Sequence, residues 1–355
     1  MSLQSLESIA KALVADGKGI LAADETAGTL TKRFEKLKIP STPESRRDYR
    51  ELLFTTSGSA DFISGVIMYD ETIRQRTSSG KPFPDILLKQ GIIPGIKVDT
   101  GAKPLAGCDK ETVTEGLDGL RERLQEYRAI GARFAKWRAV IRIANQLPSQ
   151  TCVNVNAHAL GRYAALCQEQ GIVPIIEPEV LMDGAHTIDG CGEVTGKVLH
   201  AVFDALYEQK VSLEGMLLKP NMVVCGSACP TQASVTEVAS ATLRRLQLYV
   251  PAAVPGVVFL SGGQSDTVAT AHLDAINKMA GARLWKISFS FGRALQDLAL
   301  ATWLGSKENC RAAQQAYYHR AKCNSAATLG KYSVALENEF ADETARGHRS
   351  DCEDD

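Results

Sequence analysis

The stretch GMLLKPNMV, residues 215–223, is a short apolar run that ends in Lys219 and is then interrupted by Pro220 and Asn221. A strand that packs on both faces reads as a near-continuous apolar run. A lysine at the end of such a run is costly to desolvate unless it is paired or used. Lys219 is therefore either half of an internal salt bridge or an amine with a lowered pKa that attacks a carbonyl group to form a Schiff base.

Seven other runs resemble this one, and helix-like amphipathic segments separate them. The eight predicted strands are residues 19–24, 62–70, 92–99, 132–141, 173–180, 215–223, 254–263 and 283–292. The predicted helices between them include residues 117–131, 157–171 and 193–209. Alternating strands and helices with short joints imply parallel strands joined by crossover connections.

The polar positions near the strand ends recur at regular intervals. Successive members lie 32 to 42 residues apart, in the order Lys97, Lys136, Glu177, Lys219, Ser261 and Arg293. A strand and its crossover helix need roughly 30 or more residues, so each step fits one β/α unit. Eight such units form an α/β (β/α)8 TIM barrel of about 250 residues plus insertions. A doubly wound open sheet is the weaker alternative, because no GxGxxG turn follows the first predicted strand.

Composition indicates a soluble globular protein with an ample core. The 355 residues are 45% hydrophobic and 23% charged, with a formal net charge of −1. A near-zero charge argues against a protein built mainly to bind nucleic acid or an anionic membrane, and no apolar stretch reaches the roughly 18 residues of a membrane span. The first 19 residues predict an amphipathic helix rather than a signal peptide. Nine cysteines without a CxxC pair are typical of free thiols in a reducing cytosol, which predicts a cytoplasmic protein.

No low-complexity linker divides the chain, so we predict a single domain over residues 1–333. It begins with the N-terminal helix and ends in a helical extension that includes residues 294–304 and 308–329. From Glu337 onward the sequence has eight acidic and two basic residues. Such a composition is typical of a disordered segment, and residues 334–355 are expected to form a mobile acidic tail.

Charged side chains gather at one end of the predicted strands. Residues two apart on a strand share a face and stand about 6.6 Å apart. Five strands supply such charges, namely Asp24, the pairs Lys97 with Asp99, Lys136 with Arg138 and Glu177 with Glu179, and Lys219. A salt-bridged barrel mouth would explain any one pair, but the whole set favours an active site, because chemistry in these barrels takes place where the strands end.

The residue types suggest a reaction. A nucleophilic amine needs a pKa about 3 units below the 10.4 of lysine in water, which takes about 4 kcal/mol. One like charge about 4 Å away contributes that much at an effective dielectric constant of 20, and Lys136 is the candidate. Glu177 would give a proton to the leaving hydroxyl when a carbinolamine dehydrates to an iminium. Asp24 would take a proton from a substrate hydroxyl as the adjacent carbon–carbon bond breaks.

A phosphate site is predicted beside the amine. FLSGGQS (259–265) ends a strand in glycines and precedes a helix, and Arg293 follows the next strand. Ser261, Gly262 and the helix N-terminus would bind an anion, and phosphate sites in such barrels often follow strands seven and eight. Ordinary loop geometry is the alternative. A second cationic group that would suit a second phosphate consists of Lys97, Arg33 and Arg138.

No metal site is predicted. The six histidines are never two or four residues from one another, which argues against the convergence that a divalent metal usually needs. Each histidine is expected at the surface or at a helix cap. Cys225 and Cys229 form the closest cysteine pair and have no partner pair, so they receive no ligand role.

Seven motifs resemble the class I fructose-bisphosphate aldolase family. They are GKGILAADET (17–26), GIKVDTG (95–101), FAKWR (134–138), GIVPIIEPE (171–179), LEGMLLKPNMV (213–223), FLSGGQS (259–265) and FSFGRALQ (289–296). The resemblance runs from about residue 6 to about residue 333. It implies a (β/α)8 enzyme without metal or other cofactor that cleaves fructose 1,6-bisphosphate to dihydroxyacetone phosphate and glyceraldehyde 3-phosphate, and a cytoplasmic homotetramer.

The resemblance also implies roles for individual residues. Lys219 forms the Schiff base, Glu177 is the acid–base residue, and Glu179 completes the EPE motif. The same comparison gives Asp24 near the C4 hydroxyl, the pair Lys136 and Arg138, and a C1 phosphate grip of Ser261, Gly262 and Arg293. Thr26 and Thr29 stand where the family usually has serine, and their hydroxyls would bind the other phosphate.

One departure is at the end of the chain. Many animal members end in a tyrosine that assists proton exchange, whereas this chain ends in acidic residues with no aromatic residue after Phe340. Two other functions stay open from the sequence: another Schiff-base enzyme, acting on a different sugar phosphate or on a keto acid, and a non-catalytic scaffold on the same fold. The complete set of charged residues at the strand ends favours the enzyme.

Overall fold

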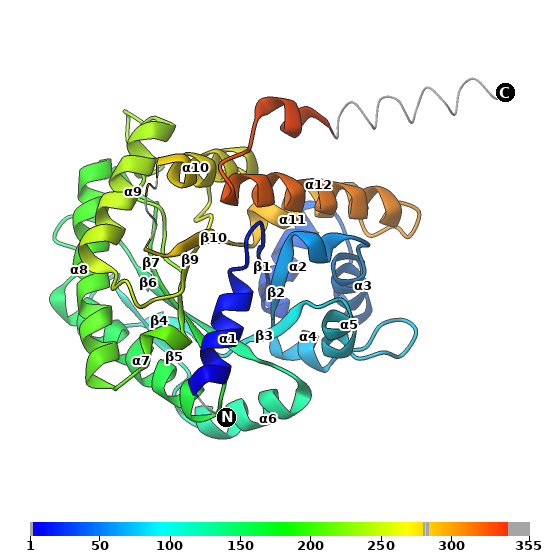
Figure 1. The fold of residues 1–355 in the computed structure, drawn as a ribbon, viewed down its shortest axis with the longest axis horizontal. Helices are drawn as coiled ribbons and strands as arrows, with labels where there is room; N and C mark the ends of the chain where they lie inside the picture. The colour runs from blue at the N-terminus through cyan, green and yellow to red at the C-terminus, as the bar shows by residue number, and fades with distance from the viewer. Residues whose placement is uncertain (1–2, 280, 282–283, 340–355) are drawn as a thin grey trace.

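The computed structural model describes residues 3–279, 281 and 284–339, and it confirms the predicted barrel (Figure 1). All neighbouring strands of the barrel are parallel, and its sheet closes in the order β1-β10-β9-β8-β7-β6-β3-β2. The strands are β1 (Gly19–Ala23), β2 (Ile63–Met68), β3 (Ile93–Lys97), β6 (Phe134–Ile141), β7 (Val173–Val180), β8 (Leu217–Leu218), β9 (Gly256–Phe259) and β10 (Lys286–Phe291). Each lies within a predicted run; residue 283, which begins the last run, lies outside the described residues.

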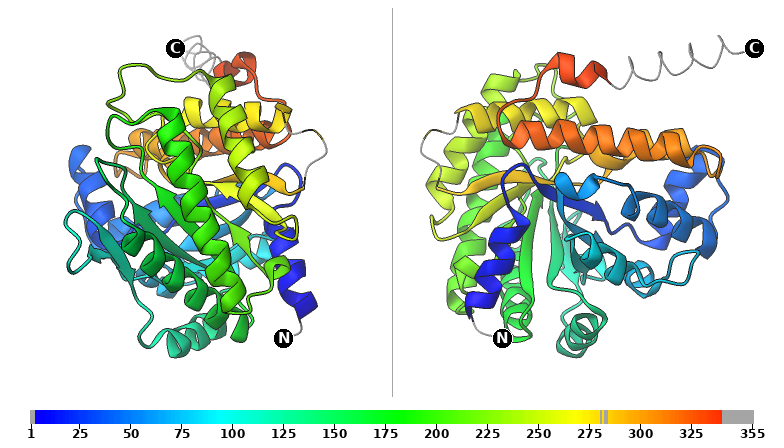
Figure 2. Two further views of the ribbon diagram at one scale, coloured as in Figure 1. Left: turned by 90° about the vertical axis from the view of Figure 1, so that its left-hand side faces the viewer. Right: turned by 45° about the vertical axis from the view of Figure 1, so that its right-hand side comes forward.

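Helices surround the barrel and connect its strands (Figure 2). They are α1 (Leu3–Leu13), α2 (Ala27–Lys36), α3 (Pro43–Phe54), α4 (Asp70–Arg74), α5 (Phe83–Lys89), α6 (Leu120–Ile130), α7 (Gln150–Glu169), α8 (Ile188–Glu208), α9 (Val235–Tyr249), α10 (Asp266–Met279), α11 (Arg293–Trp303) and α12 (Cys310–Thr328), with short 3-10 turns at Ser59–Asp61 and Leu213–Gly215. α7 begins seven residues before the predicted helix, because Ser149 caps it by accepting a hydrogen bond from the Cys152 amide. Among the described residues, no helix is long and apolar enough to cross a membrane.

A short antiparallel hairpin was not predicted. It consists of β4 (Gly101–Pro104) and β5 (Thr112–Glu115) and follows β3. Its strands are four residues long and mostly exposed or half-buried, so they lack the apolar run that identifies a barrel strand.

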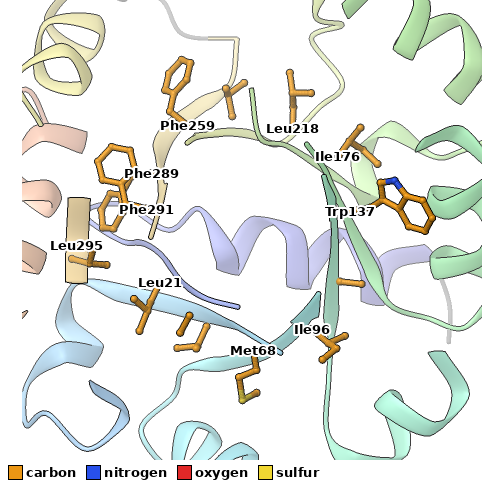
Figure 3. Packing of buried hydrophobic residues seen from close by; sticks show 14 of the residues in the cluster. Leu21, Met68, Ile96, Trp137, Ile176, Leu218, Phe259, Phe289, Phe291 and Leu295 are labelled. Atoms are coloured by element: carbon orange, nitrogen blue, oxygen red, sulfur yellow. The ribbon is translucent and has the colours of Figure 1, made fainter. Parts of the chain in front are cut away.

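Alternate residues of the barrel strands belong to two separate apolar clusters. Leu21, Trp137 and Ile176 belong to the outer cluster, which includes the surrounding helices, and Figure 3 shows these side chains around the barrel wall. Ile20 and Ile175 belong to an inner cluster. Because side chains alternate faces along a strand, this register decides which polar residues face the barrel interior.

α1 closes the N-terminal end of the barrel. Its residues Leu6, Ala10 and Leu13 are buried in the inner cluster with Phe134 of β6. The Phe134 ring lies so close to Gly95 that a Cβ there would stand 2.3 Å from a ring carbon. Apolar side chains therefore fill the barrel interior at the N-terminal ends of the strands, and polar chemistry is confined to their C-terminal ends.

The C-terminal part of the chain packs across the barrel as α12 and then turns back on it. Residues 334–339 are helical, although they were assigned to the mobile tail. Glu337 holds them, because its carboxylate pairs with buried Arg320 and accepts a hydrogen bond of 2.6 Å from the Tyr332 hydroxyl. Ordered structure thus continues six residues past the predicted boundary at 333, and residues 340–355 lie outside the described residues. The eight cysteines within the described residues are free thiols.

Candidate active site

The register of the strands turns the expected charges inward. Asp24 follows Ile20 and Ala22 on the inner face, and Glu177 follows Val173 and Ile175. Lys136 and Lys219 have the same relation to Phe134 and Leu217. The inner apolar cluster and the charged residues therefore form consecutive layers inside one barrel, with the charged layer at the C-terminal ends of the strands.

Glu177 joins the two buried lysines. Its Oε1 lies 3.0 Å from the Lys219 Nζ, and its Oε2 lies 3.1 Å from the Lys136 Nζ. The Lys136 Nζ also lies 2.6 Å from the Asp24 Oδ2. Lys136, Glu177 and Lys219 are each only 3% exposed, so water screens these charges little. The four side chains form a continuous chain of charges in the order Lys219, Glu177, Lys136 and Asp24.

The pKa values of the two carboxyl groups and of Lys136 follow from this arrangement. Burial favours the neutral acid at Asp24, but Lys136 and Lys219 outweigh it and lower the pKa of Asp24 to about 2. Burial would likewise raise the pKa of Glu177, but Lys136 and Lys219 outweigh it and lower that pKa. Burial alone would lower the pKa of Lys136, but Asp24 and Glu177 raise it. Both carboxyl groups are thus ionised, and Lys136 is charged, at neutral pH.

These contacts change the reason expected for the reactivity of Lys219. The sequence suggested Lys136 as an uncompensated like charge, whereas the Lys136 ammonium lies between two carboxylates. Its repulsion of a second ammonium is therefore partly cancelled. What the geometry offers Lys219 instead is a carboxylate at hydrogen-bonding distance that can accept its proton.

A second layer of ion pairs surrounds this cluster. Arg138 pairs with Glu179, which is 6% exposed. The Lys97 Nζ lies 2.6 Å from the Asp99 Oδ1, and Asp99 also accepts a hydrogen bond of 3.2 Å from the Arg138 amide. Lys97 and Asp99 are one of the predicted same-face pairs, whereas the ion pair of Arg138 with Glu179 joins β6 to β7 and was not predicted.

The loop that was expected to bind phosphate lies between β9 and α10. Gly262 and Gly263 have φ angles of +59° and +93°, which L-residues rarely adopt, so the loop depends on glycine at both positions. A Cβ on Gly263 would lie 3.5 Å from the Arg293 Nη2. Ser261, the glycine turn and the first residue of α11 therefore meet at one place.

One cavity of about 470 Å³ contains every predicted site residue. The set comprises Asp24, Thr29, Arg33, Lys97, Lys136, Arg138, Glu177, Glu179, Lys219, Ser261, Gly262 and Arg293. The cavity has two candidate phosphate-binding groups. One consists of Ser261, Gly262 and Arg293, and the other consists of Thr29 and Arg33 of α2. Arg33 pairs with Glu25 and with the Asp297 carboxylate at 2.7 Å, so it is already compensated.

Sequence reasoning missed several residues of this cavity. Lys32 and Lys36 line it from α2, one turn apart and exposed, and no ion pair involves either within the described residues. Their spacing of four on a short helix that Thr26 caps was a usable signal. Glu25, which also lines the cavity and pairs with Arg33 and Arg50, was not among the predicted site residues.

Two histidines are buried, contrary to the expectation of surface or capping positions. His272 and His319 are each 6% exposed. The His272 Nδ1 lies 2.6 Å from the Gln264 Oε1, just after the glycine turn, and burial lowers the pKa of His272 to about 4. Neither histidine lines the cavity.

Fold and cavity together define an enzyme on a (β/α)8 barrel, with a lysine-centred site at the C-terminal ends of its strands. The model of the family described as class-I fructose-bisphosphate aldolase, glycolytic, matches residues 5–350, and the chain belongs to this family.

Known relatives agree with this family assignment. A probable fructose-bisphosphate aldolase class 1 of Xylella fastidiosa is 57% identical, with 94% of this chain and 99% of the relative covered. Fructose-bisphosphate aldolase B of Gallus gallus is 51% identical, with coverages of 95% and 93%. A crystal structure of the aldolase of Plasmodium falciparum, in complex with TRAP and an inhibitor, superposes with a TM-score of 0.92 at 48% identity, with coverages of 93% and 95%.

Proposed function

We propose that this chain reversibly cleaves fructose 1,6-bisphosphate to dihydroxyacetone phosphate and glyceraldehyde 3-phosphate through a Schiff base on Lys219. The observation that carries the proposal is the sharing of Glu177 between Lys219 and Lys136 in a buried site flanked by two groups of cations and polar anion-binding groups. The family places the reaction in glycolysis and gluconeogenesis.

Schiff-base formation begins with proton transfer. The Lys219 ammonium gives a proton to Glu177, 3.0 Å away, and the neutral amine attacks the C2 carbonyl of the ketose. The amine nitrogen loses a second proton to the carbonyl oxygen, and protonated Glu177 then returns its proton to the resulting hydroxyl. Water leaves with the two protons that the ammonium lost, and one proton stays on the iminium nitrogen.

Carbon–carbon cleavage follows from the electron demand of the iminium. Asp24, ionised because its pKa is about 2, accepts the proton of the C4 hydroxyl. The C3–C4 bond breaks, its electron pair moves into the iminium to give an enamine, and the aldehyde leaves. The Lys136 ammonium, 2.6 Å from Asp24, stabilises this carboxylate before the transfer.

Two phosphates would bind at opposite sides of the amine. The amides of the Ser261–Gly262 turn and the Arg293 guanidinium suit the C1 phosphate, since backbone N–H groups and arginine are common phosphate ligands. The C6 phosphate would bind at the start of α2, where the hydroxyl oxygens of Thr26 and Thr29 are 3.0 Å apart. The cations that would neutralise this phosphate are Arg33, Lys32, Lys36, Lys97 and Arg138.

Borohydride trapping tests the proposal directly. Incubation with dihydroxyacetone phosphate and borohydride should give one stable adduct, which peptide mapping locates on Lys219. The Lys219→Arg variant keeps the charge and should give no adduct and no cleavage, whereas exposed Lys307→Arg is the matched control and should behave as the natural protein does. An adduct elsewhere, or none, would overturn the Schiff-base mechanism, and a chain with neither adduct nor cleavage would be a scaffold.

A substrate panel and EDTA test the remaining alternatives. Two phosphate groups predict faster cleavage of fructose 1,6-bisphosphate than of fructose 1-phosphate, and preference for a keto acid would indicate another Schiff-base enzyme. Cleavage should survive EDTA, since an amine nucleophile needs no metal.

Cellular location and assembly follow from the family and are part of the proposal. A cytosolic fructose-bisphosphate aldolase of Arabidopsis thaliana is 53% identical to this chain, and the free thiols suit a reducing compartment. We expect a cytoplasmic homotetramer. Light scattering of the purified chain measures its mass, and a monomer mass of about 38.3 kDa would contradict the tetramer.

A further inference from the structure

A cluster of three different metal-ligand types lies on α12, away from the catalytic cavity. His319 and Cys323 are one helical turn apart, and Glu337 lies near both. Figure 1 shows the segment to which Glu337 belongs, directly after α12. One ligand atom from each lies within 4.8 Å of the other two. His319 and Cys323 are buried, and Glu337 is half-buried. Side chains four apart on a helix point the same way, which is the spacing that lets two ligands share an ion.

The distances suit a tetrahedral ion. The Cys323 Sγ lies 3.5 Å from the His319 Nε2. Zinc–sulfur and zinc–nitrogen bonds of about 2.3 and 2.0 Å at the tetrahedral angle separate the two ligand atoms by about 3.5 Å. The Glu337 main-chain oxygen lies 3.0 Å from the same Nε2 and accepts its hydrogen bond. When an ion takes the Nε2 lone pair, the ring proton moves to Nδ1, and this carbonyl oxygen becomes a second oxygen ligand beside the Glu337 carboxylate.

Charge balance decides whether a cation can enter. A thiolate on Cys323 and the Glu337 carboxylate neutralise a divalent ion. The opposing charge is Arg320, which is 1% exposed and pairs with Glu337, but its Nε also lies 3.7 Å from the Asp266 carboxylate. Glu337 can therefore keep Oε1 on Arg320, while Oε2, which accepts the hydrogen bond of the Tyr332 hydroxyl, offers its second lone pair to the ion.

We propose that His319, Cys323 and Glu337 form a structural site for a divalent zinc-like ion, which fastens residues 334–339 to α12. Thiolate and imidazole ligands favour zinc over calcium or magnesium, which prefer oxygen ligands alone. The site is separate from the chemistry proposed for Lys219, because none of the three residues lines the catalytic cavity.

Metal titration of the full chain without an affinity tag tests the site. Zinc should bind with a stoichiometry of one per chain, and cobalt should give the absorption band of a thiolate-to-metal charge transfer. Cys323→Ser and His319→Gln should each weaken binding at least 10–100-fold, the loss that follows even from removal of an outer hydrogen-bond partner. Cys310→Ser, on the same helix, is the matched control and should leave the titration unchanged.

Thiol labelling supplies a readout that needs no variant. Zinc should slow alkylation of Cys323 in the natural chain, as peptide mapping measures, without slowing alkylation of Cys310. Absence of stoichiometric binding, equal binding by Cys323→Ser and the natural chain, or unprotected Cys323 in the zinc-loaded protein would each overturn the proposal. Activity is not the readout, so this result is independent of the aldolase assay.

Discussion

Glu177 contacts one buried lysine with each carboxylate oxygen, which suits it to act first as a base and later as an acid. The Lys136 ammonium next to Oε2 stays charged throughout the cycle. The proton that Glu177 accepts and later returns is therefore the one that it takes from Lys219 at Oε1. We expect Glu177→Gln to lower kcat about 10²–10⁴-fold, the usual contribution of a general acid–base group. Steady-state kinetics measures this, together with slower borohydride trapping, because the amide accepts no proton from Lys219.

The matched control is Glu115→Gln, in the exposed part of the β4–β5 hairpin. It should leave kcat unchanged. If Glu177→Gln kept the natural kcat, or if both variants lost activity equally, Glu177 would not be the proton carrier.

Asp24 links the site to the stability of the protein. Its pKa falls from 3.8 to about 2 on folding, because the lysines outweigh burial, and this shift corresponds to about 2 kcal/mol. Since the folded pKa is the lower one, the contribution is complete above pH 3.8 and is lost as the pH falls through about 2. The natural chain should therefore be more stable than Asp24→Asn by about 2 kcal/mol at pH 7 and pH 5, and by less at pH 3.

Urea unfolding at these three pH values measures the difference, with Asp61→Asn on the exposed surface as the control. A difference between the natural chain and Asp24→Asn that stays constant from pH 7 to pH 3 would contradict the depressed pKa.

The segment that follows β8 shows how a very short strand positions Lys219. β8 has only two residues, but the Lys219 amide donates a hydrogen bond of 2.8 Å to the Ile176 carbonyl, and Asn221 accepts one of 3.0 Å from the Val180 amide. The Asn221 amide group also donates to the Thr195 hydroxyl at 3.1 Å. Both ends of the Lys219 segment are thus fixed to β7 and α8.

Asn221→Ala should destabilise the protein by about 1–3 kcal/mol, because the buried Val180 amide would lose its acceptor. We expect kcat to fall as well, since Lys219 would no longer be held against Glu177. Chemical denaturation and steady-state assays measure the two effects, and Asn154→Ala on the exposed face of α7 is the control. A stable variant with reduced kcat would assign Asn221 a role in the reaction instead of in positioning.

The barrel strands were predictable because each is an apolar run, and their polar ends were predictable because they recur every β/α unit. The hairpin β4–β5 has neither signal. Contacts between distant residues were also out of reach: Lys136 lies between Asp24 and Glu177 because closure of the barrel brings the ends of β1, β6 and β7 together inside it, which the local sequence does not show. The missed cations Lys32 and Lys36 belong to a helix that the strand pattern does not address.

The same limitation explains the tail. Its acidic composition predicts mobility from residue 334, but Arg320 on α12 is buried and needs a charge partner, which Glu337 supplies. Composition describes one segment at a time, and this pairing depends on the chain turning back after Tyr332.

The last ordered turn should therefore contribute to the stability of the whole molecule. Truncation after Ser333 removes Glu337, and Glu337→Gln removes only its charge; each should lower the free energy of unfolding by about 1–3 kcal/mol, because a buried guanidinium loses its partner. Glu339→Gln is the control, since its pair with Lys322 is about half exposed and should contribute less than about 1 kcal/mol. Urea unfolding of the natural chain, the truncated chain and the two variants measures the order of their free energies of unfolding. Equal stability of Glu337→Gln and Glu339→Gln would mean that the turn adds nothing and that the folded domain ends at residue 333.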